Sequence, residues 1–138
     1  MRLNPYLNFN GQCEVAFKFY ERCLSGKIEA MMPHAGTPME EHTPPEWRDK
    51  ILHASLVVGD NVLMGSDAPP DQYEAPKGIS VSLHIADLAD AERVFHALAE
   101  NGIVTFPIQQ TFWAARFGML VDQFGIPWII NCEGAAQQ

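Results

Sequence analysis

The chain repeats one order of predicted elements, a strand, a helix and three strands, and this repeat constrains its fold more than any other feature. Phe19 and Phe95 take the same place in the two predicted helices and are 76 positions apart. Gly26 and Gly102, which follow those helices, are also 76 positions apart. Residue identity between the halves is otherwise weak, so the repeat is one of pattern. We therefore expect an α+β fold in which two βαβββ modules form a concave mixed sheet with a cleft, with the helices on the convex side.

Hydrophobic periodicity sets the bounds of the predicted elements. Helical spacing covers residues 14–24 and 88–100, and Ser25-Gly26 and Asn101-Gly102 are expected to end these helices. Two proline-containing loops, 33–49 and 67–78, interrupt the strands. We predict one domain over 1–138, with module one over 3–67 and module two over 79–133. The predicted strands cover 4–10, 27–32, 51–58, 61–66, 79–86, 104–109 and a closing hairpin within 111–132.

The closing hairpin is the most regular of these segments. Phe117, Met119 and Val121 alternate with other residues before Asp122, and an apolar run follows Gly125. This pattern indicates two strands joined by the turn Asp-Gln-Phe-Gly.

Composition excludes several classes of protein. The chain has 138 residues, of which 47% are hydrophobic and 19% charged, so it is neither disordered nor fibrous. Its three cysteines show no CxxC spacing, which argues against a disulfide framework or a thiolate zinc site. A net charge of −8 without a basic patch argues against a nucleic-acid partner. The sequence has no apolar run long enough for a membrane segment, and its N-terminus lacks the apolar centre of a signal peptide. We therefore expect a cytoplasmic protein.

A set of short motifs, spread over residues 5–131, resembles a known family. The motifs are Pro5-Tyr6-Leu7 with Phe9 and Gly11, Ala16 with Phe19-Tyr20, His53-Ala54, Ser66-Asp67, Thr111-Phe112-Trp113, Phe117-Gly118, and Asp122 with Phe124-Gly125 and Trp128. In this order and spacing they resemble the PhnB-like branch of the vicinal oxygen chelate superfamily, which includes glyoxalase, extradiol dioxygenases and the fosfomycin and bleomycin resistance proteins.

The resemblance implies a divalent metal held by one His or Glu from each of four strands, but this chain lacks those residues. The four positions fall on Pro5 or Tyr6, on Leu63 or Met64, on Ser80 or Val81, and on Ile129. Aliphatic side chains do not coordinate cations, and hydroxyl groups alone make a poor site. We therefore expect no metal of the usual kind, and no cofactor; a divalent metal would need a rearranged site.

Four side chains are candidates for binding or chemistry. Strand alternation places His53 and His84 on the predicted concave face, where they are candidates for general acid/base catalysis or for a nonstandard metal site. The alternative is that each is a hydrogen-bonded polar residue of a pocket or a strand edge. Trp113 and Arg116 could stack on or clamp a ligand anion. Alternatively, Trp113 is a packing or dimer contact and Arg116 a surface ion-pair partner.

These observations support three hypotheses of function. The first is a homodimeric protein that binds a small molecule in the sheet cleft without the usual metal, as in bleomycin resistance, where an acidic dimer sequesters a cationic compound. The second is a lyase, isomerase or dioxygenase with a rearranged site based on His53 and His84. The third, methyl transfer, comes from the label "3-demethylubiquinone methyltransferase-like" carried by this branch, although the sequence has no glycine-rich cofactor loop. The predicted ligand-binding residues are Tyr6, Leu7, His53, Met64, Ser82, His84, Trp113, Arg116 and Ile129.

Overall fold

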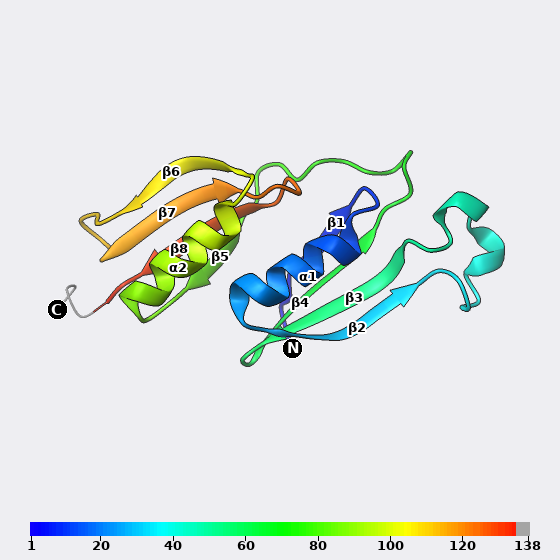
Figure 1. The fold of residues 1–138 in the computed structure, drawn as a ribbon, viewed down its shortest axis with the longest axis horizontal. Helices are drawn as coiled ribbons and strands as arrows, with labels where there is room; N and C mark the ends of the chain where they lie inside the picture. Colours follow the sequence, from blue (N-terminus) through cyan, green and yellow to red (C-terminus); the bar gives the residue numbers. More distant parts are fainter. Residues whose placement is uncertain (135–138) are drawn as a thin grey trace. The chain divides into compact units, whose positions relative to one another are not determined.

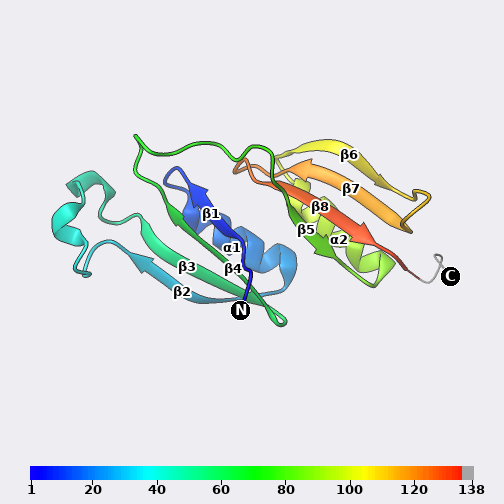
Figure 2. The same cartoon turned by 180° about the vertical axis from the view of Figure 1, so that it is seen from behind.

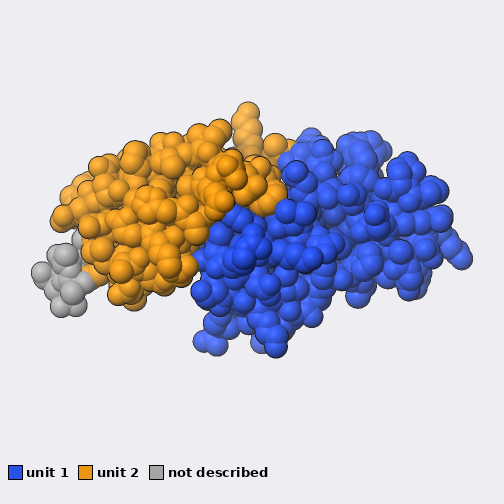
Figure 3. All heavy atoms as spheres, viewed as in Figure 1, with its two compact units in different colours: residues 1–74 blue, residues 75–138 orange. Residues whose placement is uncertain are grey.

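The computed structural model describes residues 1–134, which form two compact units. Unit 1 is Met1–Glu74, and unit 2 begins at Ala75; Figure 3 colours them separately. The two predicted modules fall one in each unit. Each unit contains one four-stranded sheet and one α-helix of 12 residues (Figures 1 and 2). Within residues 1–134, no helix has the length and apolar character needed to cross a membrane.

Unit 1 follows the predicted order of one strand, one helix and three strands. Its sheet has the order β1-β4-β3-β2, with β1 parallel to β4 and the other pairs antiparallel. The long connection between β2 and β3 contains two short 3-10 helices, η1 and η2. The bounds are β1 Tyr6–Phe9, α1 Cys13–Leu24, β2 Lys27–Pro33, η1 Glu40–His42, η2 Pro45–Trp47, β3 Ile51–Val58 and β4 Asn61–Asp67.

Unit 2 repeats this topology with the sheet order β5-β8-β7-β6, which confirms the repeat of elements predicted from the sequence. The strand register repeats as well. Tyr6 pairs with Met64 in unit 1, and Ser82, 76 positions after Tyr6, pairs with Ile129 in unit 2. The bounds are β5 Val81–His84, α2 Leu88–Ala99, β6 Ile103–Gln109, β7 Arg116–Val121 and β8 Pro127–Cys132.

Each helix covers one face of the sheet in its own unit, and the buried residues lie between them. In each strand the residues that alternate with the buried ones therefore point to the other face. We call this other face, which the unit's own helix does not cover, the open face. The largest fully buried side chains include Phe9, Phe17, Tyr20 and Leu56 in unit 1 and Phe95, Leu98, Leu120, Trp128 and Ile130 in unit 2.

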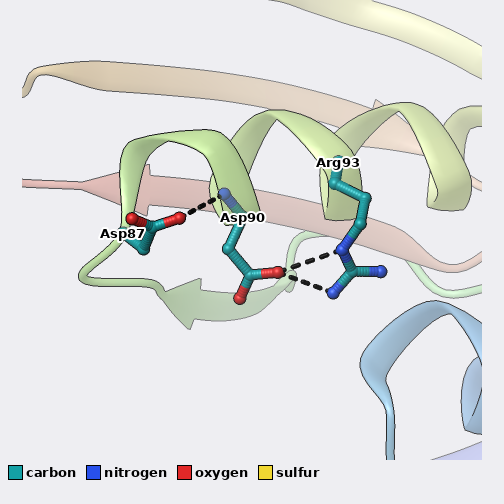
Figure 4. A network of polar contacts seen from close by, with 3 residues as sticks. All are labelled: Asp87, Asp90 and Arg93. Atoms are coloured by element: carbon teal, nitrogen blue, oxygen red, sulfur yellow. Dashed lines mark hydrogen bonds and ion pairs between the residues drawn. The ribbon is translucent and has the colours of Figure 1, made fainter.

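The two helices begin in different ways. In α2 the Asp87 carboxylate accepts a hydrogen bond from the Asp90 backbone N–H at 2.8 Å, as an N-cap residue does (Figure 4). Asp90 also forms an ion pair of 2.6 Å with Arg93 (Figure 4). The N-cap of α1, Gln12, makes no such side-chain bond.

In α1, a buried carboxylate from the end of β4 accepts the hydrogen bond from the first turn of the helix. Asp67 is 4% exposed, and its two oxygens accept hydrogen bonds from the backbone N–H groups of Cys13 and Ile51, both at 2.9 Å. Asp67 therefore ties the first turn of α1 to the start of β3.

The predicted pairs Ser25-Gly26 and Asn101-Gly102 follow the helix ends, and the two residues of each pair have different roles. The left-handed conformation is taken by Ser25 and Asn101, with φ of 54° and 58°, and not by the glycines that follow them. Gly26 is required for another reason, because a Cβ atom there would lie 2.7 Å from the carbonyl oxygen of Val57. A Cβ atom on Gly102 would likewise lie too close to the carbonyl oxygen of Val121.

The three cysteines, Cys13, Cys23 and Cys132, are free and buried. Burial raises the pKa of the Cys13 thiol, with the negative charge of Asp67 adding to the effect. Burial also raises the pKa of the Cys132 thiol, and Asp87 adds to it. Because the thiolate is the reactive form, the packing removes both the access and the ionisation that a nucleophilic cysteine needs.

Adjacent substitutions at the end of α1 should have opposite effects on stability. Gly26→Ala should lower the free energy of unfolding by about 1–3 kcal/mol, because the added methyl group must displace the backbone of β3. Ser25→Gly should raise it by about 0.5 kcal/mol, because glycine adopts positive φ without steric strain. Urea unfolding of both variants measures these changes. A neutral Gly26→Ala substitution would contradict the close approach to Val57.

The thiols should be unreactive in the folded protein. With a disulfide reagent such as 5,5′-dithiobis(2-nitrobenzoate) at mildly alkaline pH, we expect negligible modification until denaturant is added, when all three cysteines react. Absorbance of the released thiolate measures the reaction. Rapid modification of even one cysteine in the native protein would contradict the packing described.

Candidate functional site

The open faces carry most of the residues predicted to bind a ligand. In unit 1 these are Tyr6, His53 and Met64, and in unit 2 they are Ser82, His84 and Ile129. Leu7 does not belong to this set. It is 8% exposed and lies on the helix-covered face of β1, because alternation places Tyr6 on the open face.

The open face of unit 1 is centred on a contact between Tyr6 and His53. The Tyr6 hydroxyl lies 3.3 Å from His53 Nδ1, and the two rings are stacked with their centroids 5.9 Å apart. Tyr6 pairs with Met64 on the neighbouring strand, and His53 pairs with Met32. A phenol hydrogen-bonded to an imidazole can donate or accept a proton, with roles that depend on the tautomer of the histidine.

The open face of unit 2 has a row of three paired residues that crosses three strands. His84 pairs with Asn131, and Asn131 pairs with Phe117. The Asn131 side-chain nitrogen lies 3.5 Å from His84 Nδ1. His84 thus stands beside a side-chain amide, and a phenyl ring lies one strand beyond.

Phe117 belongs to an aromatic cluster made of Phe106, Phe112, Trp113 and Phe117. Phe106 and Trp113 both contact Phe117 edge to face, with centroid distances of 5.4 and 5.2 Å. Phe112 contacts Trp113 in the same manner at 4.8 Å. Of this cluster, only Trp113 is among the ligand-binding residues predicted from the sequence. The alternation along β7, which puts Phe117 on the same face as Met119, could have identified Phe117. Phe106 joins the cluster only because β6 pairs with β7.

Arg116 lies on the other side of the sheet from this cluster. Its guanidinium donates to the Glu92 carboxylate on α2 at 2.8 Å and to the Ala115 carbonyl oxygen at 2.6 Å. It shares its face with Gly118 and Leu120, which are buried on the helix-covered side. The structure therefore places Arg116 as the ion-pair partner that the sequence left as an alternative, and we leave it out of the open face.

The hairpin turn before β8 is held by a buried carboxylate. Asp122 is 3% exposed and accepts hydrogen bonds from the backbone N–H groups of Phe124 and Ile126, at 2.8 and 3.1 Å. It also accepts one from the indole Nε1 of Trp128 at 2.8 Å. This fixes Trp128 on the helix-covered face, so that Ile129 faces the open side.

The donor set on the open faces does not fit the metal centre implied by the resemblance. Tyr6 pairs with Met64 on the open face of unit 1, and Ser82 pairs with Ile129 on that of unit 2. Of the implied ligand positions Ser80 and Val81, Ser80 precedes β5, and Val81 pairs with Trp128 on the helix-covered face. A phenol, a thioether, a hydroxyl and an alkyl group are poor ligands for a hard or borderline divalent cation. Within residues 1–134, no group of three His, Cys, Asp or Glu side chains is placed to hold a metal ion.

Comparison with known proteins gives a consistent picture. The model of the family described as 3-demethylubiquinone-9 3-methyltransferase matches residues 1–131. The chain is similar to Protein YjdN of Escherichia coli (strain K12), with 33% identity over 139 residues that cover 95% of each protein. It is also similar to the crystal structure of protein PA1353 from Pseudomonas aeruginosa, with 50% identity, a TM-score of 0.89 and coverage of 97% and 98% of the two chains.

Two further structures are similar in fold. A putative 3-demethylubiquinone-9 3-methyltransferase, PhnB protein, from Bacillus cereus has 20% identity and a TM-score of 0.80, over 96% of this chain and 99% of that one. A glyoxalase/bleomycin resistance protein/dioxygenase from Nocardioides has 17% identity and a TM-score of 0.57, over 98% of this chain and 85% of that one. These likenesses confirm the predicted α+β class and the glyoxalase-like βαβββ modules.

Proposed function

The chain belongs to the family described as 3-demethylubiquinone-9 3-methyltransferase, and we propose that it is a binding protein for a small organic molecule. The molecule binds on the open face of a sheet, and the divalent metal of the vicinal oxygen chelate superfamily takes no part. One observation carries this proposal. Tyr6 pairs with Met64 on the open face of unit 1 and Ser82 pairs with Ile129 on that of unit 2, and none of these four side chains is an imidazole or a carboxylate.

The composition of the open faces supports binding of an organic ligand. Apolar and aromatic side chains such as Met64, Phe117 and Ile129 lie there beside polar groups such as His53, Ser82 and Asn131. Small-molecule sites generally have this mixture, in which apolar surface supplies affinity and polar groups fix orientation. The thiols and Arg116 take no part, because they are buried or paired.

The family description names methyl transfer, and the chain offers little support for a nucleotide-type cofactor. Such cofactors are commonly held by a glycine-rich turn between a strand and a helix. The turn from β1 to α1, residues 10–12, contains the single glycine Gly11, and the turn from β5 to α2, residues 85–87, contains none. Saturable binding of S-adenosylmethionine would favour methyl transfer over the function proposed.

The contact of Tyr6 with His53 favours a second candidate, an enzyme of the lyase, isomerase or dioxygenase type. An imidazole beside a phenol can move a proton to or from a bound substrate. His84 beside Asn131 offers a second imidazole on the open face of unit 2.

The principal test of the binding function is elemental analysis of the native protein. We expect protein purified without chelators or an affinity tag to contain no divalent metal in stoichiometric amount, because the open faces lack a set of His or carboxylate ligands. Protein incubated with Mn²⁺, Fe²⁺, Ni²⁺ or Zn²⁺ and then desalted should retain none of them. One tightly held ion per chain would contradict the proposal.

The enzyme candidate makes a different prediction for the histidines. If a screen for lyase, isomerase and dioxygenase reactions finds turnover, at least one of His53→Gln and His84→Gln should abolish it without changing the unfolding midpoint. His96→Gln is the matched control, because that imidazole is 68% exposed on α2. Equal turnover in all three variants and the parent would eliminate the enzyme candidate.

A further inference from the structure

The aromatic cluster of unit 2 exposes ring surface that a ligand can cover. Trp113 is 44% exposed and Phe112 is 93% exposed, although both rings already make edge-to-face contacts. Large exposed aromatic side chains gathered at one place commonly mark a binding surface. Aromatic rings prefer further aromatic rings in stacked or edge-to-face geometry, which adds to the gain from burial alone.

A polar group stands at a defined distance from this cluster. Asn131 is paired with Phe117 on the neighbouring strand, and neighbouring strands are about 4.8 Å apart. A ring bound against Phe117 and Trp113 therefore brings a substituent on its edge to the side-chain amide of Asn131. This amide has both a donor and an acceptor, so it can bind either a hydroxyl or a carbonyl group.

The sheet of unit 2 has no formal charge to offer a ligand. Among all residues of β5, β6, β7 and β8, only Arg116 is formally charged, and it is paired with Glu92 on the helix-covered face. Binding a charged group against such a surface removes its hydration without an opposite charge in return. The open face thus favours an uncharged ligand, although the whole chain has a net charge of −8.

We propose that the open face of unit 2 binds an uncharged aromatic ring that carries a hydroxyl or carbonyl group. The ring packs on Phe117 and Trp113, and the oxygen of the substituent meets Asn131. This inference rests on the proposed function and narrows it to one class of ligand.

Three probes with the same ring system and different charges test the ligand class. These are 2-naphthol, which is uncharged, 2-naphthoate, which is an anion, and 2-naphthylmethylammonium, which is a cation. Each is titrated into ¹⁵N-labelled protein at about pH 8, where ordinary imidazoles are neutral. About 0.3 M salt reduces the long-range attraction of the acidic chain for the cation. The signals to follow are the indole N–H of Trp113 and the side-chain amide of Asn131.

We expect 2-naphthol to shift both signals and to bind with a Kd lower than that of either charged probe by about tenfold or more, a difference that corresponds to about 1.4 kcal/mol. Asn131→Leu should raise the Kd of 2-naphthol to the Kd of unsubstituted naphthalene. Trp113→Ala should raise the Kd of both compounds, while Trp113→Phe should restore part of the affinity. His96→Gln, which changes an imidazole that is 68% exposed on α2, is the control and should leave the Kd unchanged.

Two outcomes would overturn this inference and leave the proposed function standing. One is equal or tighter binding of a charged probe at the same signals. The other is a lack of shift with all three probes while a panel of other small organic compounds shifts open-face signals, such as those of Tyr6 and His53. If no compound of such a panel binds to any open-face residue, both the inference and the proposed function fail.

Discussion

The Asp122 carboxylate, buried within the last hairpin, sets the positions on which the proposed binding surface depends. It accepts two backbone hydrogen bonds within the turn and a third from the indole of Trp128. Hydrogen bonds to a charged acceptor are stronger than those to a neutral one. Because side chains alternate along a strand, holding Trp128 beneath α2 directs Ile129 and Asn131 to the open face. A slip of one residue between β7 and β8 would reverse every one of these placements.

Unit 1 uses a buried carboxylate as well, but for a different connection. Asp67 is paired with Phe9 at the end of β1 and binds the first turn of α1 and the start of β3. It fixes the register that brings Tyr6 beside Met64. At the matching end of β8, unit 2 has Cys132, and α2 is capped by its own Asp87. The two units therefore share a topology and differ in the polar groups that stabilise it.

Much of this architecture was predictable from local sequence patterns. Periodicity and turn residues predicted both helices, the repeated order and the closing hairpin. The family label expected from the resemblance is confirmed by the family model, and the glyoxalase-like fold is confirmed by the solved structures. The error at Arg116 arose where distant segments meet. Arg116 was expected beside a ligand, but Glu92, 24 residues earlier in the chain, draws it to the helix side. The pairing of Ser82 with Ile129 and the joining of Phe106 to Phe117 likewise depend on strand register, which no single segment specifies.

The proposed ligand must bind to the open face of unit 2, whose register Asp122 sets. Nuclear Overhauser effects between bound 2-naphthol and methyl-labelled side chains test this claim directly. Met119 and Ile129 lie on the open face, while Leu120 and Ile130 are buried on the helix-covered side. We expect strong nuclear Overhauser effects from 2-naphthol to Met119 and Ile129 and none to Leu120 and Ile130. Effects confined to the helix-covered side, or to residues of α2, would contradict it.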